Sequence, residues 1–139
     1  MLVAAPLPQT LAIVREIELL EPLERKARTV TVHPATPEAG WYSVTGRIAR
    51  LVLWRGDFSY VQHDAGWHSE DLDVRRDGWR VSGGFLVSRV DDRITRVTHY
   101  EDYVLPPSLA RLRPLFAAYV RRSQVGEMRD LATLVHAPC

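Results

Sequence analysis

The run RITRVTHYEDYVLPPS, residues 93–108, constrains the fold more than any other part of this sequence. Residues 93–104 are rich in Val, Ile, Thr and Tyr, which favours a strand in a half-buried sheet. Pro106 and Pro107 stop this strand, because proline has no backbone N–H to donate to a neighbouring strand. Apolar residues then recur at steps of three and four, which predicts one long amphipathic helix over at least residues 115–134. The apolar positions are Leu112, Leu115, Phe116, Tyr119, Val120, Met128, Leu131, Leu134 and Val135.

The middle of the chain predicts an antiparallel meander. Short turns containing Gly and Asp separate most of its strand-like segments, and strands joined in this way must be antiparallel neighbours. Ahead of them, residues 6–26 carry a helical pattern that Pro22 divides into short pieces. The predicted fold class is α+β, with a short first strand, two short helices, six further strands and a long helix. The six strands are expected at residues 27–34, 41–49, 52–63, 67–74, 79–90 and 93–104.

Composition narrows the class of protein. The 139 residues, of which 46% are hydrophobic, suit one globular domain, so we interpret residues 1–139 as a single domain. A net charge of +1 gives no general attraction to nucleic acid or anionic membranes. Cys139 is the only cysteine, which excludes an intramolecular disulfide and a cysteine-based zinc site.

The start of the chain lacks the basic segment of a signal peptide, and no apolar run reaches the roughly 18 residues of a membrane span. We therefore expect a cytoplasmic protein without a nucleic-acid partner or stable membrane insertion.

The order of elements resembles the helix-grip fold of the START-like superfamily, also called SRPBCC, which includes the polyketide cyclase/dehydrase and birch-pollen-allergen branches. The resemblance is carried by AAPLPQTLAIVREIELL near the start and by ITRVTHYEDYVLPPSLARLRPLF at the last strand-to-helix junction. It covers nearly the whole chain and depends on element order and loose patterns. It implies a curved sheet wrapped around the long helix, with a cavity between them for lipids, polyketides or hormones. The first strand is unusually short, so either the natural protein begins upstream of Met1 or this sheet edge is weak.

Hairpin registers predict which strand faces line the cavity. With three residues in the turn at 64–66, Phe58 pairs with Leu72, and with a two-residue turn at Asp91-Asp92, Gly83 pairs with Tyr100. One face then collects most of the large apolar residues and is expected to be the concave one. The predicted ligand-binding residues are Trp54, Phe58, Tyr60, Glu70, Leu72, Phe85, Arg96, Tyr100, Phe116, Tyr119 and Met128.

Charged residues on this predicted inner face allow two interpretations, because buried charges are unfavourable unless they are paired or hydrogen-bonded. In the first interpretation, Glu70 and Arg96 form a structural pair with each other, or both side chains reach solvent at the strand ends. Alternatively, these two residues line the cavity with Tyr60 and Tyr100 and orient a polar group of the ligand. The sequence leaves both interpretations open.

The sequence gives little support for a metal site, for nucleophilic catalysis or for nucleotide binding. The histidines form no H-E-x-x-H pair, and His99 and Glu101 share a face that the registers assign to the outside. No G-x-S-x-G, phosphate loop or dinucleotide fingerprint is present. We therefore expect neither a metal nor a cofactor.

The primary hypothesis is noncatalytic binding of a hydrophobic small molecule, such as a lipid, polyketide or aromatic compound, between the sheet and the C-terminal helix. One alternative is an enzyme similar to polyketide cyclases or aromatases, in which Glu70, Arg96, Tyr60 or Tyr100 assists proton transfer or polarises a carbonyl. Another is a coenzyme-Q or lipid chaperone that presents its ligand to a partner. Fold alone does not decide between these functions. A homodimer is compatible with each of them.

Overall fold

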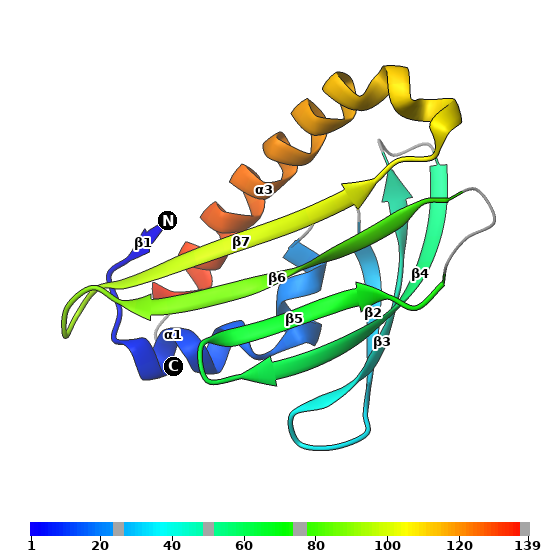
Figure 1. Cartoon of the computed structure of the whole chain (residues 1–139). Coiled ribbons are helices and arrows are strands. Elements are labelled where there is room, and N and C mark those ends of the chain that lie inside the picture. The colour runs from blue at the N-terminus through cyan, green and yellow to red at the C-terminus, as the bar shows by residue number, and fades with distance from the viewer. Residues whose placement is uncertain (24–26, 49–51, 74–77, 137–139) are drawn as a thin grey trace.

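The computed structural model describes residues 1–23, 27–48, 52–73 and 78–136. Its element order is the predicted one: a short strand, short helices, six strands and a long helix (Figure 1). The first part comprises β1 (Leu2–Val3), α1 (Leu7–Val14), α2 (Ile17–Leu20), the 3₁₀ helix η1 (Glu21–Leu23), β2 (Ala27–Pro34) and β3 (Ala39–Ile48). The second part comprises β4 (Val52–His63), β5 (Gly66–Asp71), β6 (Arg80–Arg89), β7 (Thr95–Val104), the 3₁₀ helix η2 (Pro107–Leu112) and α3 (Arg113–His136).

The strands form one seven-stranded antiparallel sheet in the order β1-β7-β6-β5-β4-β3-β2. Strands β2 to β7 are a meander, as their short connections predict. The first strand crosses to the far edge, where Leu2 lies opposite Arg96. There the Met1 ammonium donates to the Val97 carbonyl at 2.8 Å, and the Val97 N–H donates to the Met1 carbonyl at 2.9 Å. The predicted fold class is confirmed.

Helix α3 crosses the concave side of the sheet and packs unevenly along its length (Figure 1). Leu131 and Val135, in its last turns, are buried in the core. Its first turns project beyond the end of β7, and Leu115 there is 72% exposed. Space for a site therefore lies at the N-terminal half of this helix. Among the described residues, no helix is long and apolar enough to span a membrane.

The N-terminal helices close the other end of the sheet. The buried indole N–H of Trp67 donates to the Val14 carbonyl at 2.8 Å, which ties α1 to β5. The Thr95 hydroxyl donates to the Ala5 carbonyl at 2.8 Å and ties the same segment to β7. The helical region breaks between α1 and α2, ahead of the predicted break at Pro22, which lies in η1.

The strand registers differ by one residue from the predicted registers. Tyr60 lies opposite Ser69 instead of Glu70, and Gly83 lies opposite Glu101 instead of Tyr100. Because side chains alternate along a strand, a shift of one residue exchanges the faces of a whole strand. The predicted faces of β4 and β6 are correct, and those of β5 and β7 are reversed. Val74, the last residue of the predicted strand 67–74, for which the predicted register gives an inward side chain, lies outside the described residues.

Turn lengths explain the shift. Gly66 pairs with His63 as the first residue of β5, so the β4–β5 turn contains two residues instead of three. The β6–β7 connection contains five residues, because the last ladder pair is Arg89 with Thr95. Within it, the Arg93 N–H donates to the Asp91 carboxylate at 2.7 Å, a local turn that extends the predicted two-residue hairpin.

Candidate functional site

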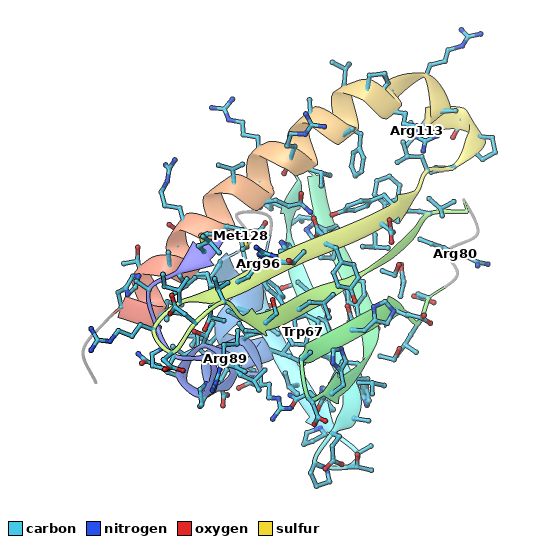
Figure 2. All side chains as sticks on the ribbon, turned by 60° about the vertical axis from the view of Figure 1, so that its left-hand side comes forward. Trp67, Arg80, Arg89, Arg96, Arg113 and Met128 are labelled. Atoms are coloured by element: carbon cyan, nitrogen blue, oxygen red, sulfur yellow. The ribbon has the colours of Figure 1, made fainter. Side chains whose placement is uncertain are left out.

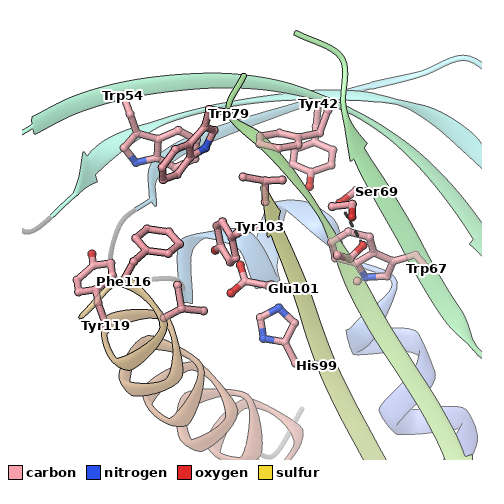
Figure 3. Close-up of a pocket in the computed structure, with 16 residues that line it drawn as sticks. Tyr42, Trp54, Trp67, Ser69, Trp79, His99, Glu101, Tyr103, Phe116 and Tyr119 are labelled. Carbon is pink, nitrogen blue, oxygen red and sulfur yellow. Dashed lines mark hydrogen bonds between the residues drawn. The ribbon is translucent and has the colours of Figure 1, made fainter. Parts of the chain in front are cut away.

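A cavity lies between the concave face of the sheet and the N-terminal half of α3 (Figure 3). Its volume is about 70 Å³. Trp54 and Trp79 face Phe116 and Tyr119 of α3 across this space. Half of its lining residues are aromatic, which is typical of sites for apolar ligands. The complete lining is Tyr42, Trp54, Phe58, Trp67, Ser69, Trp79, Val81, Ser82, Gly83, Gly84, His99, Glu101, Tyr103, Phe116, Tyr119 and Val120.

A second depression, the outer groove, adjoins the cavity between the end of β7, η2 and α3. Its volume is about 490 Å³, and it shares Glu101, Tyr103, Phe116 and Val120 with the cavity. Its other lining residues are Val104, Leu105, Ala110, Arg113, Ala117, Arg121 and Gln124. The shared side chains lie where these two spaces, both partly open to solvent, adjoin each other.

Phe116 lies between these two spaces and lines both of them. Its ring packs edge-to-face on Trp79, with centroids 5.2 Å apart, and on Tyr103, with centroids 4.9 Å apart. Edge-to-face pairs are a favourable arrangement of aromatic rings. These contacts join the residue that precedes β6, the end of β7 and the first turns of α3 at the point where the two spaces adjoin.

Two polar side chains of β7, those of His99 and Glu101, line the cavity. The His99 ring stacks on Phe85 with centroids 4.3 Å apart, and its Nδ1 lies 3.1 Å from Oε2 of Glu127 on α3. The Ser123 hydroxyl donates to the other Glu127 oxygen at 2.9 Å. The side chains of His99 and Glu127 are only 5% and 3% exposed. Although these two atoms lie 3.1 Å apart, neither Nδ1 nor Oε2 has a partner with hydrogen-bond geometry among the described residues. The Ser123 hydroxyl thus holds a carboxylate close to an imidazole that lies at the cavity wall.

Glu101 is the next inward residue of β7 and belongs to both the cavity and the outer groove. The Gln124 amide donates to its Oε2 at 3.3 Å, which holds the carboxylate toward α3. Among the residues that the structure describes, no lysine or arginine lines the cavity. No group of three His, Cys, Asp or Glu side chains in the described ranges is placed to hold a metal ion.

Four of the eleven predicted ligand-binding residues line the cavity: Trp54, Phe58, Phe116 and Tyr119. Phe85 also faces inward and packs under His99. Tyr60 is buried and lines a separate groove beside α1 and α2, where burial raises the pKa of its hydroxyl. Met128 lies far along α3 from Arg113 and packs near Met1 and Val97 instead (Figure 2).

The remaining four predicted residues, Glu70, Leu72, Arg96 and Tyr100, lie on the convex face, so their predicted inward orientation is wrong. Leu72 is 54% exposed. The partner of Glu70 is His68 rather than Arg96, with Nε2 and Oε1 3.3 Å apart. The Tyr100 hydroxyl lies 2.9 Å from Nδ1 of the same imidazole, and burial followed by the charge of Asp102 raises the tyrosine pKa.

The sequence interpretation missed the inward residues of β5 and β7 together with the Glu127 carboxylate. Trp67, His99, Glu101 and Tyr103 occupy the faces that the shifted register had turned outward. The available signal was the position of Gly66: if it begins β5, Trp67 and Ser69 must face inward.

Comparisons with known proteins identify the fold. No protein-family model matches the sequence, and no curated protein matches it. TTHA0849 from Thermus thermophilus has a similar structure, with a TM-score of 0.79 and 16% identity over 97% of this chain and 92% of that chain. Zhui aromatase/cyclase from Streptomyces sp. R1128 also gives a TM-score of 0.79, with 14% identity over 97% and 89% of the two chains. A STAR-related lipid transfer protein from Xanthomonas axonopodis gives 0.68, with 13% identity over 99% and 83%. The chain therefore has the START-like helix-grip fold, as its element order predicts.

Proposed function

We propose that residues 1–139 act as one binding domain for a hydrophobic small molecule, which occupies the cavity between the sheet and α3. The observation that carries this proposal is the aromatic lining, to which both the sheet and the helix contribute. Two proteins with similar structures are named as an aromatase/cyclase and a lipid transfer protein, which agrees with an apolar ligand. Of the residues predicted from sequence, Trp54, Phe58, Phe116 and Tyr119 are the proposed ligand contacts.

Size indicates how the ligand enters. Sites for drug-sized molecules have volumes of about 300–1,000 Å³, whereas the cavity offers about 70 Å³. Phe116 and Tyr103 separate it from the outer groove of about 490 Å³. Rotation of Phe116 away from Trp79 would join the two spaces. A ligand larger than a few heavy atoms therefore needs more space than the cavity alone offers, and displacement of this ring would supply it.

Fluorescence tests the proposal. Three of the four tryptophans, Trp54, Trp67 and Trp79, line the cavity, whereas Trp41 lies beyond it and stacks on His33. Nile red, a neutral apolar dye, should bind saturably and quench tryptophan emission, and 1-naphthylmethanol should displace it. A Trp41→Phe variant should retain the quenching. Dye binding that does not saturate, or quenching that disappears in Trp41→Phe, would contradict the proposal.

An acid–base enzyme is a second candidate function, and the buried His99–Glu127 pair favours it. A carboxylate close to an imidazole is a common arrangement for a general base, and the contact can tighten when a ligand binds. His99 replaces the catalytic candidates Glu70, Arg96 and Tyr100, which lie on the other face of the sheet. Such an enzyme would remove a proton next to a carbonyl of an aromatic ligand.

Proton exchange separates the two candidates. 2-Tetralone in D₂O should exchange its α-protons faster with the wild-type protein than in buffer, and His99→Gln should abolish the acceleration. Nile red binding serves as the folding control for this variant. If the wild type shows only the buffer rate, the enzyme candidate is rejected and the binding proposal is unaffected.

A further inference from the structure

The segment that joins β7 to the middle of α3 differs in charge from the rest of the chain. The whole chain has 18 basic and 17 acidic residues, so its charges almost balance. Residues 103–126 contain no aspartate or glutamate and four arginines, which are Arg111, Arg113, Arg121 and Arg122. Two of them share the outer groove with Glu101, whereas Arg111 and Arg122 lie outside the groove lining and are exposed. The single carboxylate of Glu101 cannot balance four guanidinium groups, so this segment has a positive excess.

Three exposed leucines of the same segment, Leu109, Leu112 and Leu115, form one row, which we call the leucine row. Leu109 and Leu112 belong to η2, and residues three apart in a 3₁₀ helix lie directly above one another. Leu115 continues the step of three into the first turn of α3. The three residues are 38%, 50% and 72% exposed. The neighbouring row, which begins at Ala110 and includes Phe116, lines the outer groove, so the leucine row is turned away from the protein.

The leucine row and the arginines lie on one accessible side of the molecule. Arg122 follows Leu115 after almost two full helical turns, so both residues lie on the same side of α3. η2 and the first turns of α3 project beyond the end of β7, which leaves this side accessible to a large partner (Figure 1). Apolar side chains next to arginines match a bilayer that contains anionic lipids, because the leucines can enter the acyl region while the guanidinium groups contact phosphates.

We propose that η2 and the first turns of α3 dock reversibly on the surface of an anionic lipid bilayer. The leucine row enters the outer part of the acyl region, and Arg111 and Arg122 contact lipid phosphates. This docking needs no membrane-spanning helix, and the described residues contain none that is long and apolar enough. The inference goes beyond ligand binding in the cavity, since it assigns a partner to the outside of the protein. Because Arg113 and Phe116 of the same turns line the outer groove, docking brings this groove next to the bilayer.

Flotation with lipid vesicles tests the inference on the wild-type chain without any cavity ligand. Vesicles of phosphatidylcholine with about 30% phosphatidylglycerol should bind the protein at least about tenfold more tightly than vesicles of phosphatidylcholine alone. About 0.5 M NaCl should weaken this binding, because salt screens the attraction of the arginines to the lipid phosphates. Equal binding to both kinds of vesicle, or no binding to the anionic vesicles, overturns the inference. Nile red binding decides the cavity proposal separately, so either proposal can fail while the other stands.

Exchange of exposed apolar residues locates the inserted surface. The double variant Leu112→Ser/Leu115→Ser should bind the anionic vesicles at least about tenfold more weakly than the wild type, because it removes inserted apolar area. Val61→Ser/Leu86→Ser is the matched control, since both residues are exposed on the convex face near the β4–β5 turn, away from η2 (Figure 1). It should bind like the wild type, and an equal loss in both variants overturns the assignment to the leucine row. If Leu112→Ser/Leu115→Ser binds vesicles normally but converts a dimer to a monomer in light scattering, a second copy is the occupant and the inference is overturned.

Exchange of exposed arginines locates the charges. The double variant Arg111→Gln/Arg122→Gln should also bind the anionic vesicles at least about tenfold more weakly, because two charges near the lipid phosphates are lost. Arg93→Gln/Arg96→Gln removes the same net charge from exposed residues at the opposite end of the molecule and should bind like the wild type (Figure 1). An equal loss in both variants would show attraction by the charge of the whole chain and overturn the assignment to this segment. Thermal unfolding would verify that all four variants fold.

Discussion

His99 Nδ1 lies 3.1 Å from Oε2 of Glu127, a contact that joins the last strand of the sheet to the C-terminal helix inside the protein. Both side chains are almost completely buried, so solvent screens their attraction little. Without this contact, the buried Nδ1 of His99 would have no polar neighbour and the buried Glu127 carboxylate would have only the Ser123 hydroxyl, which is unfavourable. The position of α3 therefore depends on this polar contact as well as on Leu131 and Val135 in the core.

Breaking this pair should destabilise the fold. His99→Leu leaves the Glu127 carboxylate buried with only Ser123 as a partner, and should lower the free energy of unfolding by about 3–5 kcal/mol. The double variant His99→Leu/Glu127→Leu should recover much of this loss, because no buried charge remains. Urea denaturation of the wild type, both single variants and the double variant measures the coupling. Additive single effects would show that the two groups do not interact.

Gly66, the first residue of β5, should tolerate no side chain. This residue has φ of +139°, and a Cβ there would lie 2.0 Å from the Phe85 carbonyl oxygen. Gly78 also has a positive φ, of +77°, but a Cβ there meets no atom within 4 Å. Gly78→Ala should cost about 1–2 kcal/mol from backbone conformation alone, and Gly66→Ala should cost clearly more. If thermal unfolding shows that Gly66→Ala and Gly78→Ala lose the same stability, β6 does not approach Gly66 as closely as the structure indicates.

Arg96 should be dispensable for both ligand affinity and stability. It is exposed on the convex face, opposite Ser88 on β6 and Leu2 on β1. Arg96→Met therefore removes neither a cavity contact nor a buried partner, and should change the free energy of unfolding by less than about 0.5 kcal/mol. Nile red affinity should also stay the same. A large loss of Nile red affinity or of unfolding free energy would indicate that Arg96 lies on the inner face of the sheet.

Tyr60 should make the protein sensitive to alkaline pH. Burial raises the pKa of its hydroxyl above the ordinary value of 10.0. Because the folded state retains the proton that the unfolded state releases, the stability from this group is complete below about pH 10 and falls as the pH rises through the folded pKa. Tyr60→Phe removes the ionisable group, so its unfolding free energy should fall less steeply above pH 10 than that of the wild type. Parallel profiles would show that Tyr60 is not the responsible group.

The elements of the fold could be predicted because each has a local cause. Pro106 and Pro107 end β7, the apolar stripe defines α3, and short polar turns leave the strands no pairing except with their sequence neighbours. Long-range pairing was harder to predict. The sequence indicates no position for β1 in the sheet, and the pairing of Leu2 with Arg96 emerges only from the structure.

The site was predicted less well because its residues depend on register. A two-residue turn before Gly66 instead of a three-residue turn brings Trp67 inward and sends Glu70 outward. In the same way, the five-residue connection before Thr95 turns His99 inward and Tyr100 outward. Neither turn length follows from the residues alone. Glu127 was missed for a different reason: a charged residue beside the apolar stripe of a helix is normally expected to face solvent.

Filling the cavity is the most direct test of the central claim that this space binds the ligand. Val81 lines the cavity from β6, whereas Val61 lies on the convex face of β4 and is 55% exposed. Val81→Trp and Val61→Trp add the same volume inside and outside the proposed site, and thermal unfolding would verify that both variants fold. The account predicts that Val81→Trp weakens Nile red binding at least about tenfold, since about 1.4 kcal/mol of lost contact suffices, and that Val61→Trp binds like the wild type. Equal binding by the two folded variants would contradict the account.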